Sequence, residues 1–269
     1  MNRSNVKSIQ VAGAAFMAVA ALAAAVPAWA QGSDRTEGAA QTVPGVRNIV
    51  LVHGAFADGS GWRGVYDDLT ARGYRVTIVQ NPLTSLADDV AATDRVLDLQ
   101  DGPAILVGHS WGGAVITEAG DHPNVAGLVY VAAFAPDAGQ SVMDQYAVVP
   151  PGPNFQPAPT ADGFAFLNGA TFKAGFAADL ADADAAFLRD SQVPIAGSAL
   201  YAPVSRAAWR TEPTWYVVAT EDGAIAPDLQ RHMAARAGAR TTEVQGSHVV
   251  FISRPRAVAD VIVAAASAD

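Results

Sequence analysis

Short apolar runs alternate along this chain with longer amphipathic stretches, and this alternation constrains the fold more than any other feature. Six runs have the length and residue types of strands: NIVLVH (48–53), RVTIVQ (75–80), AILVGH (104–109), VAGLVYVAAF (125–134), TWYVVAT (214–220) and ARTTEVQ (239–245). The first four are apolar at nearly every position, as strands covered on both faces must be. We therefore expect a parallel sheet.

Helix-like segments lie between these runs, at 62–72, 85–99, 111–120, 227–237 and 254–266. In 85–99 the apolar residues fall roughly on one stripe, while the charged residues, Asp89 among them, fall mostly elsewhere. Strands and helices that alternate in this order predict an α/β fold, with a doubly wound, mostly parallel sheet of about six strands.

The alternation fails in one long stretch, residues 136–212. It begins with the proline-rich VVPPGPNFQPAP and continues with many aromatic residues and a helix-like ADADAAFLRD. Such a long interruption between two core strands is rarely a plain loop. We expect a cap inserted between a first core part (48–135) and a second (213–269); an irregular, partly disordered insertion is the alternative.

The first thirty residues differ from the rest of the chain in composition. Arg3 and Lys7 precede an Ala/Val-rich run from 11 to 26, and Ala28-Trp29-Ala30 comes before Gln31. This pattern predicts a signal peptide cleaved after Ala30, and hence a periplasmic or secreted protein. An uncleaved anchor is the alternative, although the run is short for a membrane span. Residues 31–47 are polar and rich in Gly and Ala, so we expect a flexible mature N-terminus.

The charge and the absence of cysteine exclude several classes of function. The formal net charge is −9, and because residues 1–30 carry two basic and no acidic side chains, the mature chain carries −11. Nucleic acid and anionic membrane surfaces are therefore not expected as partners. A chain with no cysteine has no disulfide, no thiolate metal site and no cysteine nucleophile.

The stretch LVGHSWGG (106–113) places a serine among glycines, between a predicted strand and a predicted helix. Gly108-His109-Ser110-Trp111-Gly112 fits the nucleophile elbow G-x-S-x-G. The turn is so sharp that the flanking positions have room only for hydrogen. In return, the serine hydroxyl stands above the carboxyl end of the sheet, at a helix N-terminus that favours negative charge. Ser110 is the predicted nucleophile.

A serine hydroxyl needs a general base, and five histidines are available. His53 ends the first strand, where a structural role is expected, and the side chain of His109 is expected to point away from the nucleophile. His122 precedes a proline at a helix end, and His232 lies on a helix face. His248 follows the last strand, in a loop at the edge where Ser110 also lies, so we predict it as the base.

The base needs an acid from the end of the preceding strand. TEDGAIAPD (220–228) supplies Glu221, Asp222 and Asp228. Asp222 falls at the turn, whereas Asp228 already belongs to the next helix. Asp222 is therefore favoured, with Asp137 as the alternative. The chain order Ser, Asp, His is the one expected of this fold.

Backbone amides should stabilise the oxyanion of a tetrahedral intermediate. Trp111 follows the nucleophile directly, and Ala55 follows His53-Gly54 at the end of the first strand; Phe56 is a possible substitute for Ala55. We expect no cofactor and no metal. GSGWRG (59–64) has nucleotide-loop spacing, but it does not follow its strand directly, and the next strand ends without a carboxylate for a ribose.

These residues resemble the α/β-hydrolase superfamily, and within it the small capped group that includes plant methyl-ester esterases, hydroxynitrile lyases and bacterial esterases. The resemblance covers roughly 48–267 and rests on VHGAFADGSGW, GHSWGG, TEDGAIAPDLQR and VQGSHVVF. It implies Ser110 as nucleophile, Asp222 as acid and His248 as base. The lyases carry a lysine directly after the catalytic histidine, where this chain has Val249, and they replace the glycine that is intact here as Gly54.

The resemblance therefore implies hydrolysis rather than cyanohydrin cleavage. The expected function is an exported esterase that cleaves small-molecule carboxylic esters through an acyl-enzyme. Two alternatives stay open: a ligand-binding or receptor-like protein with negligible turnover, and perhydrolase-type (haloperoxidase-type) acyl transfer.

Overall fold

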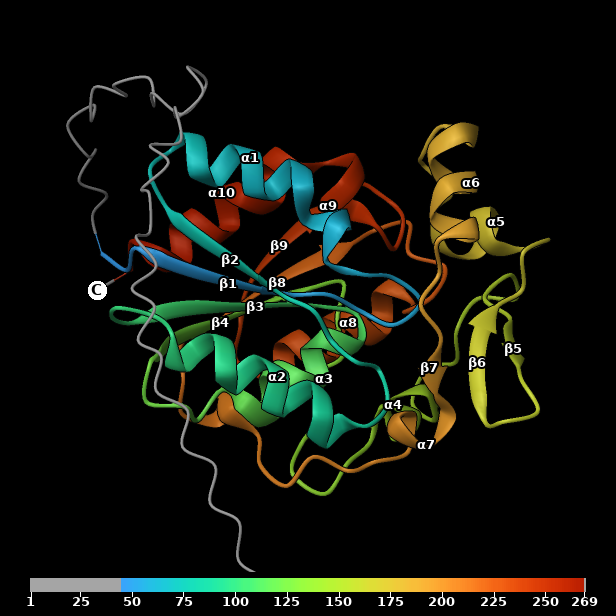
Figure 1. Ribbon diagram of the computed structural model, residues 1–269, viewed down its shortest axis with the longest axis horizontal. Helices are drawn as coiled ribbons and strands as arrows, with labels where there is room; N and C mark the ends of the chain where they lie inside the picture. The colour runs from blue at the N-terminus through green and yellow to red at the C-terminus, as the bar shows by residue number, and fades with distance from the viewer. Residues whose placement is uncertain (1–44, 269) are drawn as a thin grey trace, which may run out of the picture. The chain divides into compact units, whose positions relative to one another are not determined.

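The computed structural model describes residues 45–268 and contains a six-stranded parallel sheet, as predicted (Figure 1). Its strands are β1 (Asn48–Val52), β2 (Arg75–Val79), β3 (Ala104–His109), β4 (Val125–Val131), β8 (Thr214–Ala219) and β9 (Arg240–Val244). They lie in the order β2-β1-β3-β4-β8-β9. This order reverses direction after β1, which is the doubly wound arrangement that the alternation of strands and helices predicted.

Helices cover both faces of the sheet. On one face lie α1 (Arg63–Ala71), α9 (Val250–Ser253) and α10 (Pro255–Ala266); on the other lie α2 (Leu86–Asp98), α3 (Trp111–Ala119) and α8 (Pro227–Arg236) (Figure 1). Short 3₁₀ helices, Gly59–Trp62 and Ala208–Arg210, precede α1 and β8. None of the helices in the described part of the chain is both long and apolar enough to cross a membrane.

Burial along the strands differs from the expectation at one run. Every residue of β1, β3 and β8 is buried, because these strands lie inside the sheet. The run 75–80 was expected to be covered on both faces, but it forms β2 at the sheet edge and only its last strand residue, Val79, is buried. Apolar composition therefore identified the strand without identifying its place in the sheet.

The run 125–134 forms a shorter strand than predicted. β4 ends at Val131, because Ala132 takes a positive φ of 44° and turns the backbone out of the sheet. The following residues then pass beneath the nucleophile turn, where the Phe134 amide donates to the Ser110 carbonyl over 3.1 Å. The interruption serves the site, since it supports the turn that carries Ser110.

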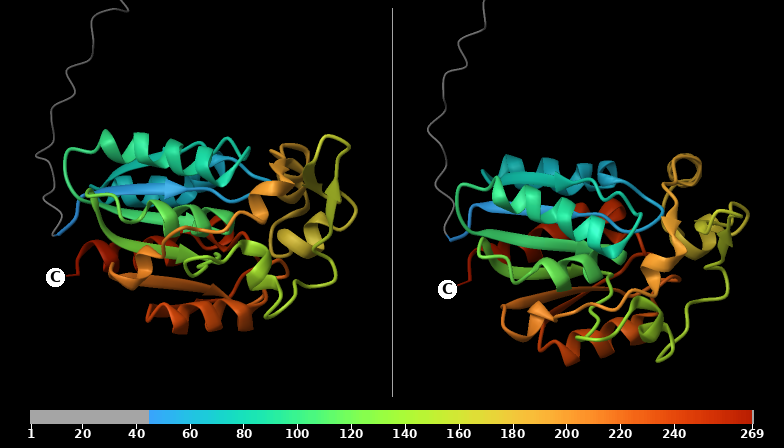
Figure 2. Two further views of the ribbon diagram at one scale, coloured as in Figure 1. Left: turned by 90° about the horizontal axis from the view of Figure 1, so that it is seen from below. Right: turned by 60° about the horizontal axis from the view of Figure 1, so that its bottom comes forward.

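Residues 136–212 contain small elements at the carboxyl ends of the sheet strands (Figure 2). They are α4 (Val142–Tyr146), β5 (Pro157–Pro159), β6 (Phe164–Leu167), α5 (Phe172–Phe176), α6 (Asp182–Asp190), β7 (Ile195–Ala196) and α7 (Gly197–Leu200). β5, β6 and β7 form a separate antiparallel sheet. We call residues 136–212 the cap.

The predicted signal peptide (1–30) lies outside the described residues, as does most of the predicted flexible segment 31–47. Of that segment, residues 45–47 are described, and the Val46 amide donates to the Ala266 carbonyl at the end of α10.

Candidate active site

Ser110 stands at the turn between β3 and α3, with a φ of 52° and a ψ of −120°. Glycines make this turn possible. A Cβ atom at Gly108 would lie 2.5 Å from the Gly112 carbonyl oxygen, and one at Gly112 would lie 2.7 Å from the Val52 carbonyl oxygen. Both contacts are with backbone, which cannot move aside. The strained serine is held by its surroundings, as is usual where strain serves a site.

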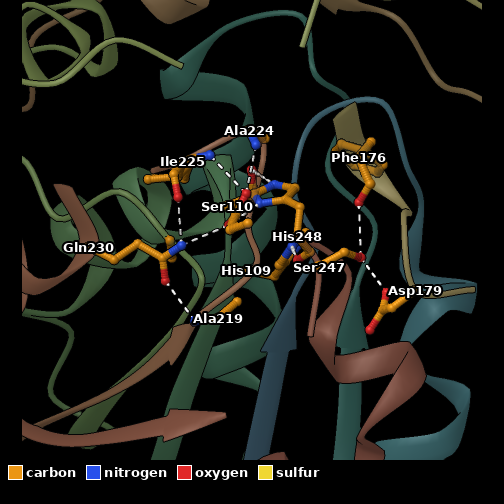
Figure 3. Close-up of polar contacts among 12 residues, drawn as sticks. His109, Ser110, Phe176, Asp179, Ala219, Ala224, Ile225, Gln230, Ser247 and His248 are labelled. Carbon is orange, nitrogen blue, oxygen red and sulfur yellow. Dashed lines mark hydrogen bonds and ion pairs between the residues drawn. The ribbon is translucent and has the colours of Figure 1, made fainter. Parts of the chain in front are cut away.

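The three residues predicted as a triad are brought together, and Figure 3 shows Ser110 beside His248. His248 Nε2 lies 2.8 Å from Ser110 Oγ, and His248 Nδ1 lies 2.7 Å from Asp222 Oδ2. The three residues follow β3, β8 and β9, so the topology gathers them at the carboxyl edge of the sheet. All three are buried. Their geometry is that of a nucleophile, a base and an orienting acid.

Four hydrogen bonds hold the Asp222 carboxylate. The amides of Ala224 and Ile225 donate to Oδ1 over 2.7 and 2.9 Å, while Gln230 Nε2 and His248 Nδ1 donate to Oδ2. Gln230 is itself fixed, because its Oε1 accepts from the Ala219 amide over 3.0 Å. The sequence analysis did not single out Gln230, although the segment PDLQR containing it formed part of the resemblance.

The other acids considered have different partners. Asp137, the alternative orienting acid, forms an ion pair with Arg210 on the surface. Asp228 pairs with Arg231, and Glu221 accepts from Gln245 Nε2 over 2.8 Å.

His109 contributes more than the sequence suggested. Its side chain was expected simply to point away, yet its Nε2 donates to the His248 carbonyl over 3.0 Å, and the two ring centroids are 4.7 Å apart. Burial and the neighbouring His248 hold the pKa of His109 well below its ordinary value. A neutral imidazole therefore packs behind the predicted base and supports its backbone.

The remaining histidines lie away from Ser110. His53 is buried, with its Nδ1 2.8 Å from the Gly54 carbonyl and its Nε2 accepting from the Asn81 amide, which matches the expected structural role. Burial lowers its pKa. His122 contacts Asp98 near the surface, and His232 is exposed on α8.

Ala55 and Trp111, the predicted oxyanion donors, both line the cavity next to Ser110. Phe56, named as a substitute, has a positive φ of 63°, so the chain turns sharply directly after Ala55. The Trp111 indole is anchored in the core, where its Nε1 donates to Asp89 Oδ2 over 2.7 Å.

Asp89 corrects the interpretation of the helix at 85–99, because it is completely buried rather than directed away from the core. Its Oδ1 accepts from the Leu83 amide over 2.8 Å, while its Oδ2 accepts from Trp111. Burial raises the pKa of Asp89 to about 6, although both hydrogen bonds act to lower it. A buried carboxyl group thus hydrogen-bonds Trp111, the residue that directly follows Ser110.

A cavity of about 150 Å³ opens beside the Ser110 hydroxyl. Except for Ser110, every residue lining it is apolar or aromatic. The sheet side contributes Ala55, Trp111 and Phe134, and the cap contributes, among others, Val142, Phe155, Phe176 and Leu200. The Tyr146 hydroxyl, a polar group at this wall, is engaged with the Ala224 carbonyl over 3.2 Å. Among residues 45–268, no three His, Asp or Glu side chains gather as metal ligands would.

Comparisons with known proteins agree with this architecture. A carbendazim hydrolyzing esterase of Nocardioides sp. (strain SG-4G) is 36% identical over 112 residues, which are 36% of this chain and 46% of that protein. A pyrethroid hydrolase of Sphingobium wenxiniae is 37% identical over 122 residues, 40% of this chain and 43% of that protein. The alignments thus span less than half the length of these curated relatives.

The fold is shared with solved structures. The crystal structure of a pyrethroid hydrolase from Sphingobium faniae JZ-2 superimposes with a TM-score of 0.69 at 22% identity, covering 83% of this chain and 98% of that one. The model of the alpha/beta hydrolase family matches residues 49–261, which include the cap and all of the sheet except Asn48. The chain therefore belongs to the alpha/beta hydrolase family.

Proposed function

We propose that this protein is a serine hydrolase that cleaves carboxylic esters of small, uncharged molecules. The observation that carries the proposal is the continuous chain of hydrogen bonds from Asp222 through His248 to Ser110, which opens onto an apolar cavity. The names of the curated relatives, an esterase and a pyrethroid hydrolase, support it.

In the proposed reaction Ser110 Oγ attacks the ester carbonyl while His248 Nε2 takes its proton. Asp222 keeps the imidazole in the tautomer whose Nε2 is free to accept, and stabilises the imidazolium that forms. The backbone amides of Ala55 and Trp111 donate to the oxyanion. His248 then protonates the leaving alcohol and activates a water that hydrolyses the acyl-enzyme.

The cavity specifies the class of substrate. An apolar cavity of about 150 Å³ holds one benzene ring. A charged group placed there would lose its hydration and find no partner, which costs far more than burying an apolar group gains. We therefore infer that one part of the ester is neutral and no larger than a phenyl or butyl group.

The direct test is Ser110→Ala, assayed with p-nitrophenyl acetate, butyrate, benzoate and hemisuccinate. Wild type is expected to prefer butyrate or benzoate to the charged hemisuccinate. The variant should lose at least about 10⁴-fold in kcat, as removal of a triad member does. Ser191→Ala, an exposed cap serine, is the matched control and should keep full activity. Undiminished hydrolysis by Ser110→Ala would refute the proposal.

The same assay separates the alternatives. A ligand-binding protein would bind the esters without turnover, and a perhydrolase would need peroxide to consume them at full rate. Labelling wild type with a fluorophosphonate and sequencing the modified peptide should locate the adduct at Ser110.

Export is a separate proposal, based on the pattern of residues 1–30. Expression of the full chain in a bacterium that processes such signals should yield a periplasmic or secreted protein beginning at Gln31. A product that retains Met1 and stays in the cytoplasm would contradict it.

A further inference from the structure

One segment of the cap contacts the loop that carries the predicted base. This segment, residues 176–180, follows α5, and the loop, residues 245–249, follows β9. The Phe176 ring packs against the His248 imidazole with centroids 4.9 Å apart. Next to it, Ser247 donates its hydroxyl to the Asp179 carboxylate and lies 3.4 Å from the Phe176 carbonyl (Figure 3). The cap therefore contacts both His248 and its neighbour.

The Asp179 carboxylate fits closely against this loop. A Cβ atom at Gly246 would lie 3.1 Å from Asp179 Oδ2 and 3.4 Å from the Ser253 hydroxyl. A larger residue at 246 would therefore crowd the carboxylate. Among the residues that the structure describes, no Lys or Arg forms an ion pair with Asp179. The Asp179 carboxylate is thus directed at the loop. Many other surface acids of this protein pair instead with an arginine.

The electrostatics agree with an ionised acceptor. Burial acts to raise the pKa of Asp179, but the hydrogen bond from the Ser247 hydroxyl, with the Ser253 hydroxyl and the Ser247 amide close by, holds it below its ordinary value. Hydrogen bonds to an ionised acceptor are stronger than neutral ones. The bond from Ser247 to Asp179 is therefore charge-assisted and adds a restraint on the loop.

Three groups of contacts fix the loop around His248. The Glu221 amide donates to the Gly246 carbonyl over 3.0 Å, and His109 donates to the His248 carbonyl. Both of these groups belong to the sheet side. The contacts of Asp179 and Phe176 come from the cap, and Phe176 also lines the substrate cavity. Of these three groups, only the third connects the loop 245–249 directly to the cap.

We propose that Asp179 is a positioning residue for His248: through Ser247 it holds the loop so that Nε2 stays within reach of Ser110 when the cap covers the cavity. This inference rests on the proposed function of the triad. A displaced loop would lengthen the bond from His248 to Ser110, whereas the cavity that binds the substrate would keep its walls.

The test compares Asp179→Ala and Ser247→Ala with Asp179→Asn and Ser247→Thr, which keep the acceptor oxygen and the hydroxyl. Each alanine variant should lower kcat by about 10- to 100-fold, the size expected for a misplaced catalytic group. KM should change by less than about twofold, because the cavity is intact. The conservative variants should recover most of the loss. Asp182→Ala removes an exposed cap acid that pairs with Lys173, and it should leave kcat unchanged.

The double variant Asp179→Ala/Ser247→Ala should lose no more than the poorer single variant, since both remove one interaction. If wild type hydrolyses esters through Ser110 but Asp179→Ala keeps its kcat, this inference is wrong and the proposed function stands.

A readout without turnover tests the inference even where the esterase assay fails. The proton between His248 Nδ1 and Asp222 gives a downfield NMR resonance, which should shift or broaden in Asp179→Ala and stay unchanged in Asp182→Ala. An unchanged resonance in a folded Asp179→Ala variant would overturn the positioning role.

Discussion

The carboxyl edge of the sheet and the cap build the same site by different means. At the sheet edge, backbone geometry places the residues. The strands end there and glycines permit a sharp turn. Ser110, Asp222 and His248 meet because the strands that they follow belong to one parallel sheet. In the cap, elements as short as the two residues of β7 pack through their side chains. The placement of the predicted triad therefore depends mainly on the backbone of the sheet, and much of the cavity wall depends on side chains of the cap, with Asp179 as the proposed link between the two.

The largest effect should come from the sheet edge, where Asp222→Asn replaces one carboxylate oxygen by an NH₂ group. Because the amides of Ala224 and Ile225 require an oxygen at the Oδ1 position, the new NH₂ group must face His248 and Gln230. The histidine then adopts the wrong tautomer, and kcat should fall by about 10⁴-fold. Steady-state kinetics with p-nitrophenyl butyrate measures this loss. Asp137→Asn, at the alternative acid, should cost little; the reverse result would reassign the acid.

That Ser110, Asp222 and His248 lie together at the sheet edge could be expected from the sequence for a physical reason. Glycines around Ser110, and the polar residues that follow β8 and β9, are local signals, because each is imposed by its own turn. Gln230 and Asp89 carry no such signal, since their roles arise from contacts with Asp222 and Trp111 far along the chain. In the sequence alone, a buried aspartate on a helix cannot be distinguished from one that faces solvent. Asp89 was therefore assigned to the polar side of its helix.

The cap was predicted only as an insertion, for the same reason. Its aromatic residues show no regular period, and contacts such as Ser247 to Asp179 join residues 68 positions apart. No turn or strand end requires an acid at 179. The position of such a residue is fixed only when the cap packs on the sheet.

Two carboxyl groups beside the site should respond to pH in opposite directions. Burial raises the pKa of core Asp89 from 3.8 to about 6, so in this range the folded state binds more protons than the unfolded state. Stability due to this group is therefore present at low pH and lost as the pH rises through about 6, by roughly 3 kcal/mol at 1.36 kcal/mol per pKa unit. The pKa of cap Asp179 is lowered, so its contribution is lost as the pH falls.

Urea denaturation from pH 4 to pH 7 measures both contributions. As the pH rises, wild type should lose unfolding free energy relative to Asp89→Asn. Over the same pH range, wild type should gain unfolding free energy relative to Asp179→Asn. Comparing variants removes the common contribution of the buried histidines His53 and His109, whose lowered pKa values act in the same range. A flat difference for Asp89→Asn would show that this carboxyl is not held neutral.

A glycine-to-alanine substitution should destabilise the protein more at the nucleophile turn than in the cap. Gly112→Ala at the nucleophile turn places a Cβ 2.7 Å from one backbone oxygen and 2.8 Å from another, and such overpacking costs about 3 kcal/mol. Gly163→Ala in the cap meets nothing within 4 Å and only has to accept its φ of 87°, at a cost of about 1 kcal/mol. Equal losses in urea denaturation would contradict the claim that backbone packing is tighter at the sheet edge.

The smallest effect, Leu200→Phe, should change selectivity while the chemistry continues. Leu200 lines the cavity from α7, and a larger side chain there takes up part of the space that a benzoyl group needs. The ratio of kcat/KM for p-nitrophenyl benzoate to that for acetate should fall about tenfold, the scale of a few misfitting carbon atoms. Acetate turnover should persist, because Leu200 is not among the residues that hydrogen-bond the loop of His248. The exposed neighbour Tyr201 provides the control as Tyr201→Phe. If kcat/KM falls equally for benzoate and acetate, the cap wall at α7 also affects the triad. Leu200 would then contribute to the rate of the reaction as well as to the choice of substrate.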